Sequence, residues 1–375
     1  MDTFADEQLR YRIALANIKG MNRLLAETLL QQTGDVSAFF TLSPKELTDL
    51  TGWDSSLFSQ EERGRALRMA AEEVAFVRKK GITPLFFTDD DYPQRLLECD
   101  DAPIILYYKG CSAALQASHV VSIVGTRHAT PYGKNFVETL VRDLSDACPD
   151  TLIVSGLAYG IDVTAHRAAL RYGLPTIAVL AHGLNTIYPA QHRNTAVDML
   201  DRGGLLTEYA SSQITHKGFF LARNRIVAGL ADAVVVVESG VKGGSLFTAT
   251  IAGDYHRDVF ALPGRVGDIS SMGCNNLIRN NKAALITCAD DLIEAMGWAA
   301  RSAKPAQAPL ATFDTADLTP DEQNIMQYLT TQGEGQINRM AVELNTPIAT
   351  LSATLVELEF KARVIAFPGG IYRPV

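Results

Sequence analysis

The stretch Val120-Val121-Ser122-Ile123-Val124, followed directly by Gly125-Thr126-Arg127, decides the fold class of this chain. Four of the five residues from Val120 to Val124 are β-branched and aliphatic, which predicts a strand. An apolar run that is continuous rather than alternating indicates a strand buried on both faces. Further runs of this kind occur at Leu152–Val154, Thr176–Leu180, Leu205–Thr207, Ala233–Val237, Val259–Leu262 and Ala284–Ile286. The intervals between them are long enough for crossover helices. The sequence therefore predicts an α/β fold with an extended, Rossmann-like, doubly wound and mainly parallel sheet.

The flanking segments differ in pattern from this central region. Two more strands, near Ile82–Phe87 and Ile104–Tyr108, extend the predicted sheet, so the central domain covers residues 79–298. Residues 1–78 show helical spacing only, with short helices joined by glycine turns. The segment is predicted to be an all-helical domain of the SAM or helix-hairpin-helix kind. Such a domain either presents backbone N–H groups to a phosphate or serves as a protein-contact module; we favour the second interpretation.

The C-terminal part begins with a linker at residues 299–311, which is rich in alanine and proline. Residues 312–375 then show three helices and a hairpin, the order of a winged helix. From Ala311 to Val375 there are four Lys and Arg residues against eight Asp and Glu residues, and the third helix has no cation before Lys361. A helix that reads a DNA groove needs donors to the base edges, so we interpret this domain as a protein-contact or regulatory module.

Composition indicates an ordinary globular chain of 375 residues, with 47% hydrophobic and 20% charged residues and a net charge of −8. No apolar run is long enough to span a bilayer, and the N-terminus lacks the pattern of a secretory signal, so we expect no membrane association. Five scattered cysteines without CxxC spacing indicate neither a disulfide framework nor a zinc site and fit a reducing cytoplasm. The net charge leaves room for a local basic groove.

The segment Phe219-Phe220-Leu221-Ala222-Arg223-Asn224-Arg225 places two guanidinium groups beside two aromatic rings. Arginine presents a planar fork of donors that fits phosphate oxygens, and phenylalanine offers a face for a nucleobase. The alternative is that these arginines pair with nearby carboxylates such as Glu208 or Glu238. The segment alone leaves both possibilities open.

The loops that follow the predicted strands favour phosphate contact. In an open α/β sheet, ligands bind beyond the carboxyl ends of the strands. Glycine-rich loops at that edge let backbone N–H groups approach an anion. Three such loops follow strands here, beginning at Gly125, Ser155 and Glu238, and Arg127, Lys217, Arg223, Arg225 and Lys242 belong to the same edge. So many cations indicate a groove rather than a site for one phosphate.

Other chemistries have less support. The loop after Val124 does not match the dinucleotide fingerprint, and the chain has no Walker motif. Candidates for acid–base work are Asp162, His166, His182 and Glu208; Asp162 and His166 share a helix face, either as a structural contact or as a dyad. No residue spacing suggests a metal site, and we expect no cofactor.

Several ordered motifs resemble those of the DprA/Smf family of bacterial DNA-processing proteins. They are Gly125-Thr126-Arg127, Ser155-Gly156-x-Ala158-x-Gly160-Ile161-Asp162-x-x-Ala165-His166, Tyr188-Pro189, Phe220-x-x-Arg223-Asn224-Arg225-Ile226, Gly244-Ser245-Leu246-x-Thr248-Ala249 and Leu262-Pro263-Gly264. The resemblance covers residues 81–290, roughly. Two departures are Thr126, where serine is more usual, and Gly243, where serine often stands. Neither removes a side-chain donor from the expected site.

The resemblance implies a single-stranded DNA-binding protein of natural transformation. Such a protein protects incoming strands, loads the RecA recombinase onto them, works in the cytoplasm, forms homodimers through the Rossmann-like domain and is not an enzyme. The residues that it implies for DNA contact are Gly125, Thr126, Arg127, Ser155, Gly156, Lys217, Phe220, Arg223, Asn224, Arg225, Lys242, Gly244 and Ser245. The alternative is a nucleoside-monophosphate phosphoribohydrolase on a related α/β fold, with Glu208 or Glu238 as its glutamate. The Pro-Gly-Gly-x-Gly-Thr loop of those enzymes is absent.

Overall fold

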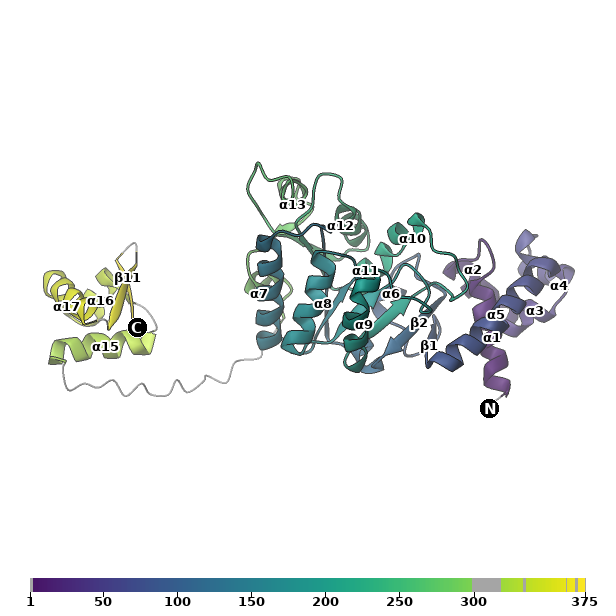
Figure 1. Ribbon diagram of the computed structural model, residues 1–375, viewed down its shortest axis with the longest axis horizontal. Helices are drawn as coiled ribbons and strands as arrows, with labels where there is room; N and C mark the ends of the chain where they lie inside the picture. The colour runs from purple at the N-terminus through teal and green to yellow at the C-terminus, as the bar shows by residue number, and fades with distance from the viewer. Residues whose placement is uncertain (1–2, 299–317, 333–334, 362, 368–369, 375) are drawn as a thin grey trace. The chain divides into compact units, whose positions relative to one another are not determined.

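The computed structural model describes residues 3–298, 318–332, 335–361, 363–367 and 370–374 (Figure 1). Residues Met1–Ser302 form one compact unit and Ala303–Val375 form a second. The predicted linker, residues 299–311, lies outside the described residues, as do residues 312–317. None of the described helices is long and apolar enough to cross a membrane.

A nine-stranded sheet forms the centre of the larger unit, in the order β1-β2-β6-β5-β4-β3-β7-β8-β9. Its strands are β1 (Thr83–Phe86), β2 (Ile105–Gly110), β3 (His119–Gly125), β4 (Thr151–Ser155), β5 (Thr176–Val179), β6 (Gly204–Thr207), β7 (Ala233–Val237), β8 (Asp258–Ala261) and β9 (Ala284–Leu285). From β6 to β9 all neighbours pair in parallel, whereas β1 and β2 are antiparallel additions at one edge. The predicted α/β class with a mainly parallel, doubly wound sheet is confirmed.

Helices cover both faces of this sheet. They are α6 (Gln94–Leu97), η2 (Ser112–Gln116), α7 (Pro131–Ala147), α8 (Ile161–Tyr172), η3 (Ala190–His192), α9 (Arg193–Asp198), η4 (Met199–Asp201), α10 (Lys217–Ala222), α11 (Asn224–Gly229), α12 (Gly244–Asp254), α13 (Met272–Arg279) and α14 (Ala289–Ala295). Val235 and Val237 share a buried cluster with α7, α8 and α14, whereas Val234 and Val236 share one with α11 and α12. The alternation follows from the two-residue period of a strand, and the continuous valine run of β7 is therefore buried on both sides.

The winding of the chain creates a switch point between β3 and β7. From β3 the chain proceeds through β4 and β5 to β6 on one side, and from β7 it proceeds through β8 to β9 on the other. The two strands are neighbours in register, with Gly125 opposite Val237 at their carboxyl ends. Loops leaving a switch point in opposite directions open a crevice there, which makes this edge the expected ligand position.

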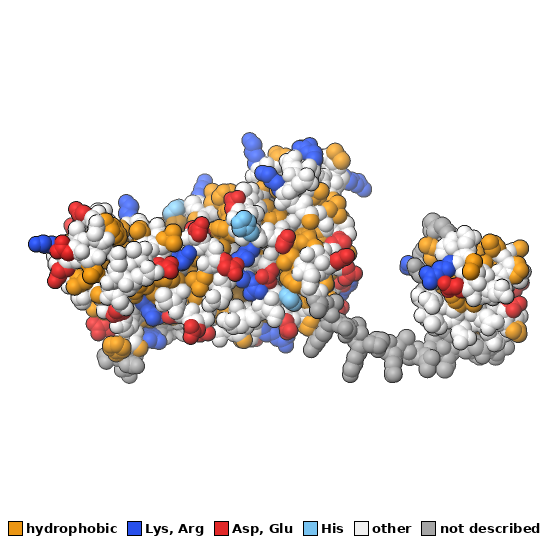
Figure 2. Space-filling view, turned by 180° about the vertical axis from the view of Figure 1, so that it is seen from behind, with side chains coloured by type: hydrophobic (Ala, Val, Ile, Leu, Met, Phe, Trp, Pro, Cys, Tyr) orange, Lys and Arg blue, Asp and Glu red, His pale blue; other side chains and the backbone are white. Residues whose placement is uncertain are grey.

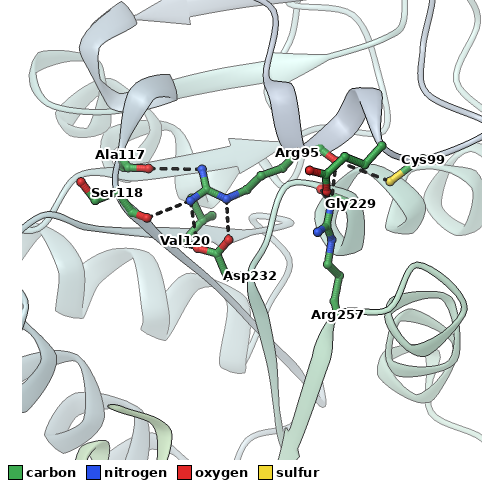
Figure 3. A network of polar contacts seen from close by, with 9 residues as sticks. Arg95, Cys99, Ala117, Ser118, Val120, Gly229, Asp232 and Arg257 are labelled. Atoms are coloured by element: carbon green, nitrogen blue, oxygen red, sulfur yellow. Dashed lines mark hydrogen bonds and ion pairs between the residues drawn. The ribbon is translucent and has the colours of Figure 1, made fainter. Parts of the chain in front are cut away.

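The opposite ends of the same strands are fastened by Arg95 of α6 (Figure 3). Its Nε and Nη2 donate to the Asp232 carboxylate at 2.6 and 3.0 Å, and Nη1 and Nη2 also donate to the carbonyls of Ala117 and Ser118. Asp232 in turn accepts the N–H of Val120 at 2.8 Å. This network ties the beginnings of β3 and β7 together and leaves their carboxyl ends to the ligand crevice.

The N-terminal helices pack directly on the sheet unit. They are α1 (Thr3–Ala16), α2 (Arg23–Thr33), α3 (Val36–Thr41), α4 (Pro44–Thr51), η1 (Ser56–Phe58) and α5 (Gln60–Lys80). Their buried side chains, such as Ile13 and Phe39, belong to the same apolar cluster as Phe86 of β1. Glu73 of α5 accepts hydrogen bonds from the N–H of Ser211 at 2.9 and 3.0 Å and from its hydroxyl at 2.6 Å. The comparison with SAM or helix-hairpin-helix modules stays a prediction.

The smaller unit has a core of its own. Its elements are α15 (Pro320–Gln332), β10 (Gly335–Gln336), α16 (Ile337–Glu343), α17 (Ile348–Phe360), β11 (Val364–Phe367) and β12 (Ile371–Pro374), and its sheet order is β10-β12-β11. Leu329 of α15 and Leu351 and Leu355 of α17 are fully buried in it. Three helices and a closing hairpin thus follow one another as expected. The winged-helix classification and the protein-contact role stay predictions.

Candidate nucleic-acid interface

A pocket of about 280 Å³ opens at the switch point. It lies beyond the carboxyl ends of β3 and β7, on the side of the unit from which α10 and α12 rise (Figure 1). Its lining consists of Val124, Gly125, Thr126, Arg127, Gly156, Ala158, Asp162, Phe220, Leu221, Arg223, Asn224, Val227, Ser239, Gly240, Gly243, Gly244, Ser245 and Thr248. The charged side chains of this described lining are Arg127, Arg223 and Asp162, so the lining carries a net positive charge.

The loop after β3 is held close to the sheet by backbone contacts. A Cβ atom on Gly125 would overlap the carbonyl oxygen of Val237 and lie 2.6 Å from Cγ1 of Ile161, so glycine is required here. The N–H of Thr126 donates to the carbonyl of Glu238 at 2.8 Å, and its own carbonyl accepts the N–H of Ile161 at 3.1 Å. These bonds fix the loop and leave the side chain of Arg127 exposed at the pocket rim.

Glu238 stabilises the start of α7 rather than facing the pocket. Its side chain is buried, and its carboxylate accepts the N–H of Thr130 at 2.8 Å and the Thr130 hydroxyl. Glu208, the other glutamate considered for catalysis, accepts a hydrogen bond from Arg225. Neither lines the pocket, so the described geometry gives no support to a catalytic glutamate there.

Arg223 forms the floor of the pocket instead of lying on its surface. The residue is 6% exposed, and its Nη1 donates to the carbonyl of Val179 at the end of β5. Its guanidinium lies against Gly156, where a Cβ atom would come within 2.5 Å of Cζ of the arginine. The Nε of Arg223 is buried without a hydrogen-bond partner among the described residues. Glycine after β4 is therefore needed to admit the guanidinium.

Asp162 balances this buried charge. Its carboxylate accepts the N–H groups of Gly156 and Ala158 at 3.1 and 3.3 Å, in the first turn of α8. Burial raises the pKa of Asp162, and Arg223 and the two backbone donors oppose that shift. Burial lowers the pKa of Arg223, whereas Asp162 raises it and Arg127 lowers it further. Arg127 and Arg223 both line this pocket, where a bound anion would relieve the repulsion between their guanidinium groups.

Helix α12 supplies the second kind of anion donor. Its first turn contains no acidic residue, and no side chain caps its start at Gly243. A Cβ atom on Gly244 would meet no atom within 4 Å, so the backbone is open to an approaching ligand. Ser245 is buried and donates to the hydroxyl of Ser239 at 2.9 Å. The first N–H groups of such a helix lack intrahelical partners and favour a phosphate oxygen.

Aromatic side chains flank the pocket on one side. Phe220 is half-buried and meets the Tyr188 ring edge-on, with centroids 5.9 Å apart. Tyr188 is 55% exposed, and its N–H donates to Nε2 of the buried His182 at 3.2 Å. Phe219 is used differently, because it stacks on Tyr209 with centroids 4.0 Å apart. The sequence analysis named Tyr188 only as part of the Tyr188-Pro189 motif and did not predict that it contacts a base. The structure places its exposed ring beside Phe220, the predicted base-stacking residue.

The structure brings nine of the thirteen predicted DNA-contact residues into the pocket lining. These are Gly125, Thr126, Arg127, Gly156, Phe220, Arg223, Asn224, Gly244 and Ser245. Lys217 and Lys242 are exposed outside this lining.

Two of the predicted residues are engaged elsewhere. Ser155, the last residue of β4, is fully buried, and its hydroxyl donates to the carbonyl of Ile123 at 2.6 Å. Arg225 is paired with Glu208 and also donates to the carbonyl of Asp101 at 2.7 Å. Arg225 therefore pairs with a carboxylate, which was one of the two possibilities for this segment. Arg223 lines the pocket, as the other possibility required.

His166, another acid–base candidate, makes structural contacts inside the sheet unit. His166 is fully buried and contacts the Thr176 hydroxyl through Nδ1 at 2.7 Å. That hydroxyl also lies 2.8 Å from the carbonyl oxygen of Ile153, to which it donates. Burial lowers the pKa of His166 to about 3, which keeps the ring neutral. Among the described residues no group of three His, Cys, Asp or Glu side chains could hold a metal ion.

Positive side chains on the visible surface are local rather than widespread. Figure 2 shows acidic and basic side chains interspersed over the larger unit, with Lys and Arg side chains projecting from the lobe that carries α12 and α13. This distribution fits a confined anion site on an acidic protein better than a broad basic face.

Comparison with solved structures shows two close likenesses. One is the X-ray structure of DNA processing protein A (DprA) from Streptococcus pneumoniae, with a TM-score of 0.63 and 32% sequence identity, over 76% of this chain and 97% of that one. The other is DNA processing protein A from Helicobacter pylori, with a TM-score of 0.52 and 32% identity, over 57% of this chain and 95% of that one. The work on the second protein concerns its single-stranded DNA binding mode.

Sequence comparison agrees with the structural likeness. The chain is 36% identical to a putative DNA processing protein DprA of Mycobacterium tuberculosis, over 74% of this chain and 73% of the relative. It is 33% identical to the protein Smf of Escherichia coli, over 84% and 86% respectively. The model of the family described as DNA recombination-mediator protein A matches residues 83–297, which include every residue of the pocket. The chain therefore belongs to the DNA recombination-mediator protein A family, also called DprA/Smf.

Proposed function

We propose that this protein binds single-stranded DNA at the switch-point pocket without regard to sequence. The observation that carries the proposal is the convergence of Arg127 and Arg223 on a hollow whose one described carboxylate, Asp162, is already occupied by backbone donors. The relative from Helicobacter pylori, which binds single-stranded DNA, supports the same ligand. The family membership supports a role as a recombination mediator.

Each part of the pocket has a distinct role in this proposal. Arg127 at the rim and the first N–H groups of α12 bind phosphate oxygens, while Arg223 contributes its charge from the floor. Phe220 and Tyr188 stack against a base, which contributes roughly 1–3 kcal/mol per base in such proteins. Asn224 lines the pocket at the start of α11 and can donate to either group. None of these contacts reads a base edge, so binding is expected to tolerate any sequence.

Replacing Arg127 by alanine tests the rim contact without disturbing the fold, because this side chain is exposed. We expect affinity for oligothymidylate to fall several-fold. The log–log dependence of affinity on salt should become shallower by about 0.7 for each phosphate that the variant no longer neutralises. The measurement is fluorescence anisotropy over a salt series, with thermal unfolding as the test of folding.

Arg142→Ala is the matched control, because Arg142 is an exposed arginine on α7 outside the pocket lining. It should leave both affinity and salt dependence unchanged. Equal affinity of the Arg127→Ala variant and the wild type at every salt concentration would contradict the assignment.

We propose further that the protein loads RecA onto the bound strand and acts as a homodimer in the cytoplasm. The family membership supports these roles. The β9 edge, where Leu285 is half-exposed at the end of the sheet order, offers one surface for pairing through the sheet domain.

Assembly can be measured directly. Sedimentation should give twice the chain mass, and Leu285→Asp should shift the protein towards the mass of one chain. RecA pull-down with the full chain and with residues 1–302 should show equal capture if the sheet unit carries the contact. Loss of capture with residues 1–302 would assign it to the smaller unit instead.

A further inference from the structure

A second hollow, of about 430 Å³, lies on the same unit beyond Tyr188. We name it the Lys109 hollow. It is bounded by the segment Leu184–Ile187, by α9 and η4, and by the last residue of α5, with Lys109 from β2 at its side. Helix α9 and strand β2 are drawn next to each other in Figure 1. Sequence reasoning gave this region no function.

Three cations surround the Lys109 hollow: Lys80, Lys109 and Arg193. No residue of its described lining is acidic, and no hydrogen bond or ion pair to a described residue engages any of the three side chains. A neighbouring arginine is paired by contrast: Arg78, two residues before Lys80, forms an ion pair with Asp6. Three uncompensated charges around one hollow on a protein of net charge −8 indicate a local site for an anion.

The wall of the hollow is apolar. Leu184, Ile187 and Leu200 are partly buried there, and Val197 of α9 is 56% exposed. An apolar wall within a ring of cations suits a ligand that combines flat apolar groups with phosphates. A nucleic-acid strand has this combination, because its bases pack on apolar side chains while its backbone carries one negative charge per nucleotide.

The Lys109 hollow continues the path of the strand bound at the switch-point pocket. Ile187 lines the hollow, and the next residue, Tyr188, touches Phe220 of the pocket. Ile187 and Tyr188 therefore connect the edge of the Lys109 hollow with the aromatic side of the switch-point pocket. A strand that leaves the pocket over Phe220 and Tyr188 enters a hollow whose described lining has three cations and no acidic side chain.

We infer that the Lys109 hollow is a second subsite for the same single strand, which binds the nucleotides that follow those in the switch-point pocket. This inference rests on the proposed function of that pocket. It also assigns a role to the N-terminal helical segment, because Lys80 at the end of α5 supplies one of the three charges. The subsite extends the length of DNA bound per chain and leaves the pocket chemistry unchanged.

The test compares the wild type with the triple variant Lys80→Ala, Lys109→Ala, Arg193→Ala. Oligothymidylates of about 4 and about 16 nucleotides are used, a span that matches the site sizes of other single-strand-binding folds. The short strand fills the pocket alone, so its affinity should stay within twofold of wild type. The long strand should bind about tenfold more weakly, and its salt slope should fall by about 2, since three cations each release counterions from one phosphate.

A matched control removes three exposed cations elsewhere, in the variant Lys45→Ala, Arg279→Ala, Lys282→Ala. Both triple variants change the formal net charge from −8 to −11, because each loses three positive charges. The control should bind the long strand as tightly as the wild type. Val197→Glu, which places a negative charge in the hollow at an exposed position, should weaken binding of the long strand only.

Each outcome decides the inference. Loss confined to the long strand supports it. Unchanged binding of the long strand, or equal losses for both strands or for both triple variants, overturns it. Two other results would contradict the proposed function of the pocket itself: a wild type that binds neither strand, or an Arg127→Ala variant that binds the long strand as tightly as the wild type. Both differ from the result that contradicts the second subsite alone, which is a triple variant that binds the long strand normally.

Discussion

Arg223→Ala is expected to lower the free energy of unfolding by about 3 kcal/mol and to abolish binding of short oligothymidylate. The substitution removes the hydrogen bond to Val179 and leaves a cavity under Gly156. It also leaves the buried Asp162 carboxylate without its nearby positive charge. Urea unfolding measures the first effect, and fluorescence anisotropy measures the second at a temperature where the variant is folded.

A second substitution separates charge from packing at this position. In the double variant Arg223→Ala, Asp162→Asn, the unpaired charge is gone, and the amide oxygen can still accept a backbone N–H. We expect about 1 kcal/mol of stability to return, whereas DNA binding should not. A single variant as stable as the wild type would show that Arg223 does not form the pocket floor. Recovery of DNA binding in the double variant would show that the charge of Arg223 does not contribute to binding.

The second large effect is expected at Gly125, where alanine should destabilise the protein by about 3 kcal/mol or more. The added methyl group would overlap the carbonyl oxygen of Val237 and press on Ile161, both of which are buried parts of the scaffold. Neither the strand pair nor the start of α8 can yield without losing hydrogen bonds. Chemical denaturation of the purified variant measures this loss.

Gly244→Ala is the matched partner of this prediction, since the same methyl group there meets no protein atom within 4 Å. Its stability should equal or slightly exceed that of the wild type, because alanine restricts the unfolded chain. Its affinity for oligothymidylate should fall several-fold, because the methyl group stands where a phosphate approaches α12. Equal stability of the two variants would contradict the close packing at Gly125, and normal DNA affinity of Gly244→Ala would contradict the role of α12.

Much of the fold could be predicted because its signals are local. The run Ala233–Val237 is apolar at every position, and only a strand covered on both faces buries all five side chains. Glycines after β3 and β4 marked the edge at which the pocket forms. The direction of β2 could not be predicted, because its antiparallel pairing with β6 joins residues 94 to 100 positions apart in the chain.

The candidate site was predicted as a set, although the role of each member was not. Arg223 and Arg225 are two positions apart and carry the same group, yet one is buried beneath the pocket and the other is paired with Glu208. Their different directions follow from the start of α11, which turns successive side chains to different sides of the helix. Which partner each side chain meets depends on β4, β5 and β6, and these strands come together only in the folded sheet.

The sequence by itself determined the class of the fold, the edge of the sheet at which the pocket opens and the family, because each depends on short runs of residues whose hydrophobicity or backbone freedom has few alternatives. Only the tertiary structure decided that Ser155 points into the core, that Asp162 balances Arg223, and that Lys80, Lys109 and Arg193 surround a second hollow. Burial and charge pairing depend on segments far apart in the chain, and no local pattern records how close those segments come.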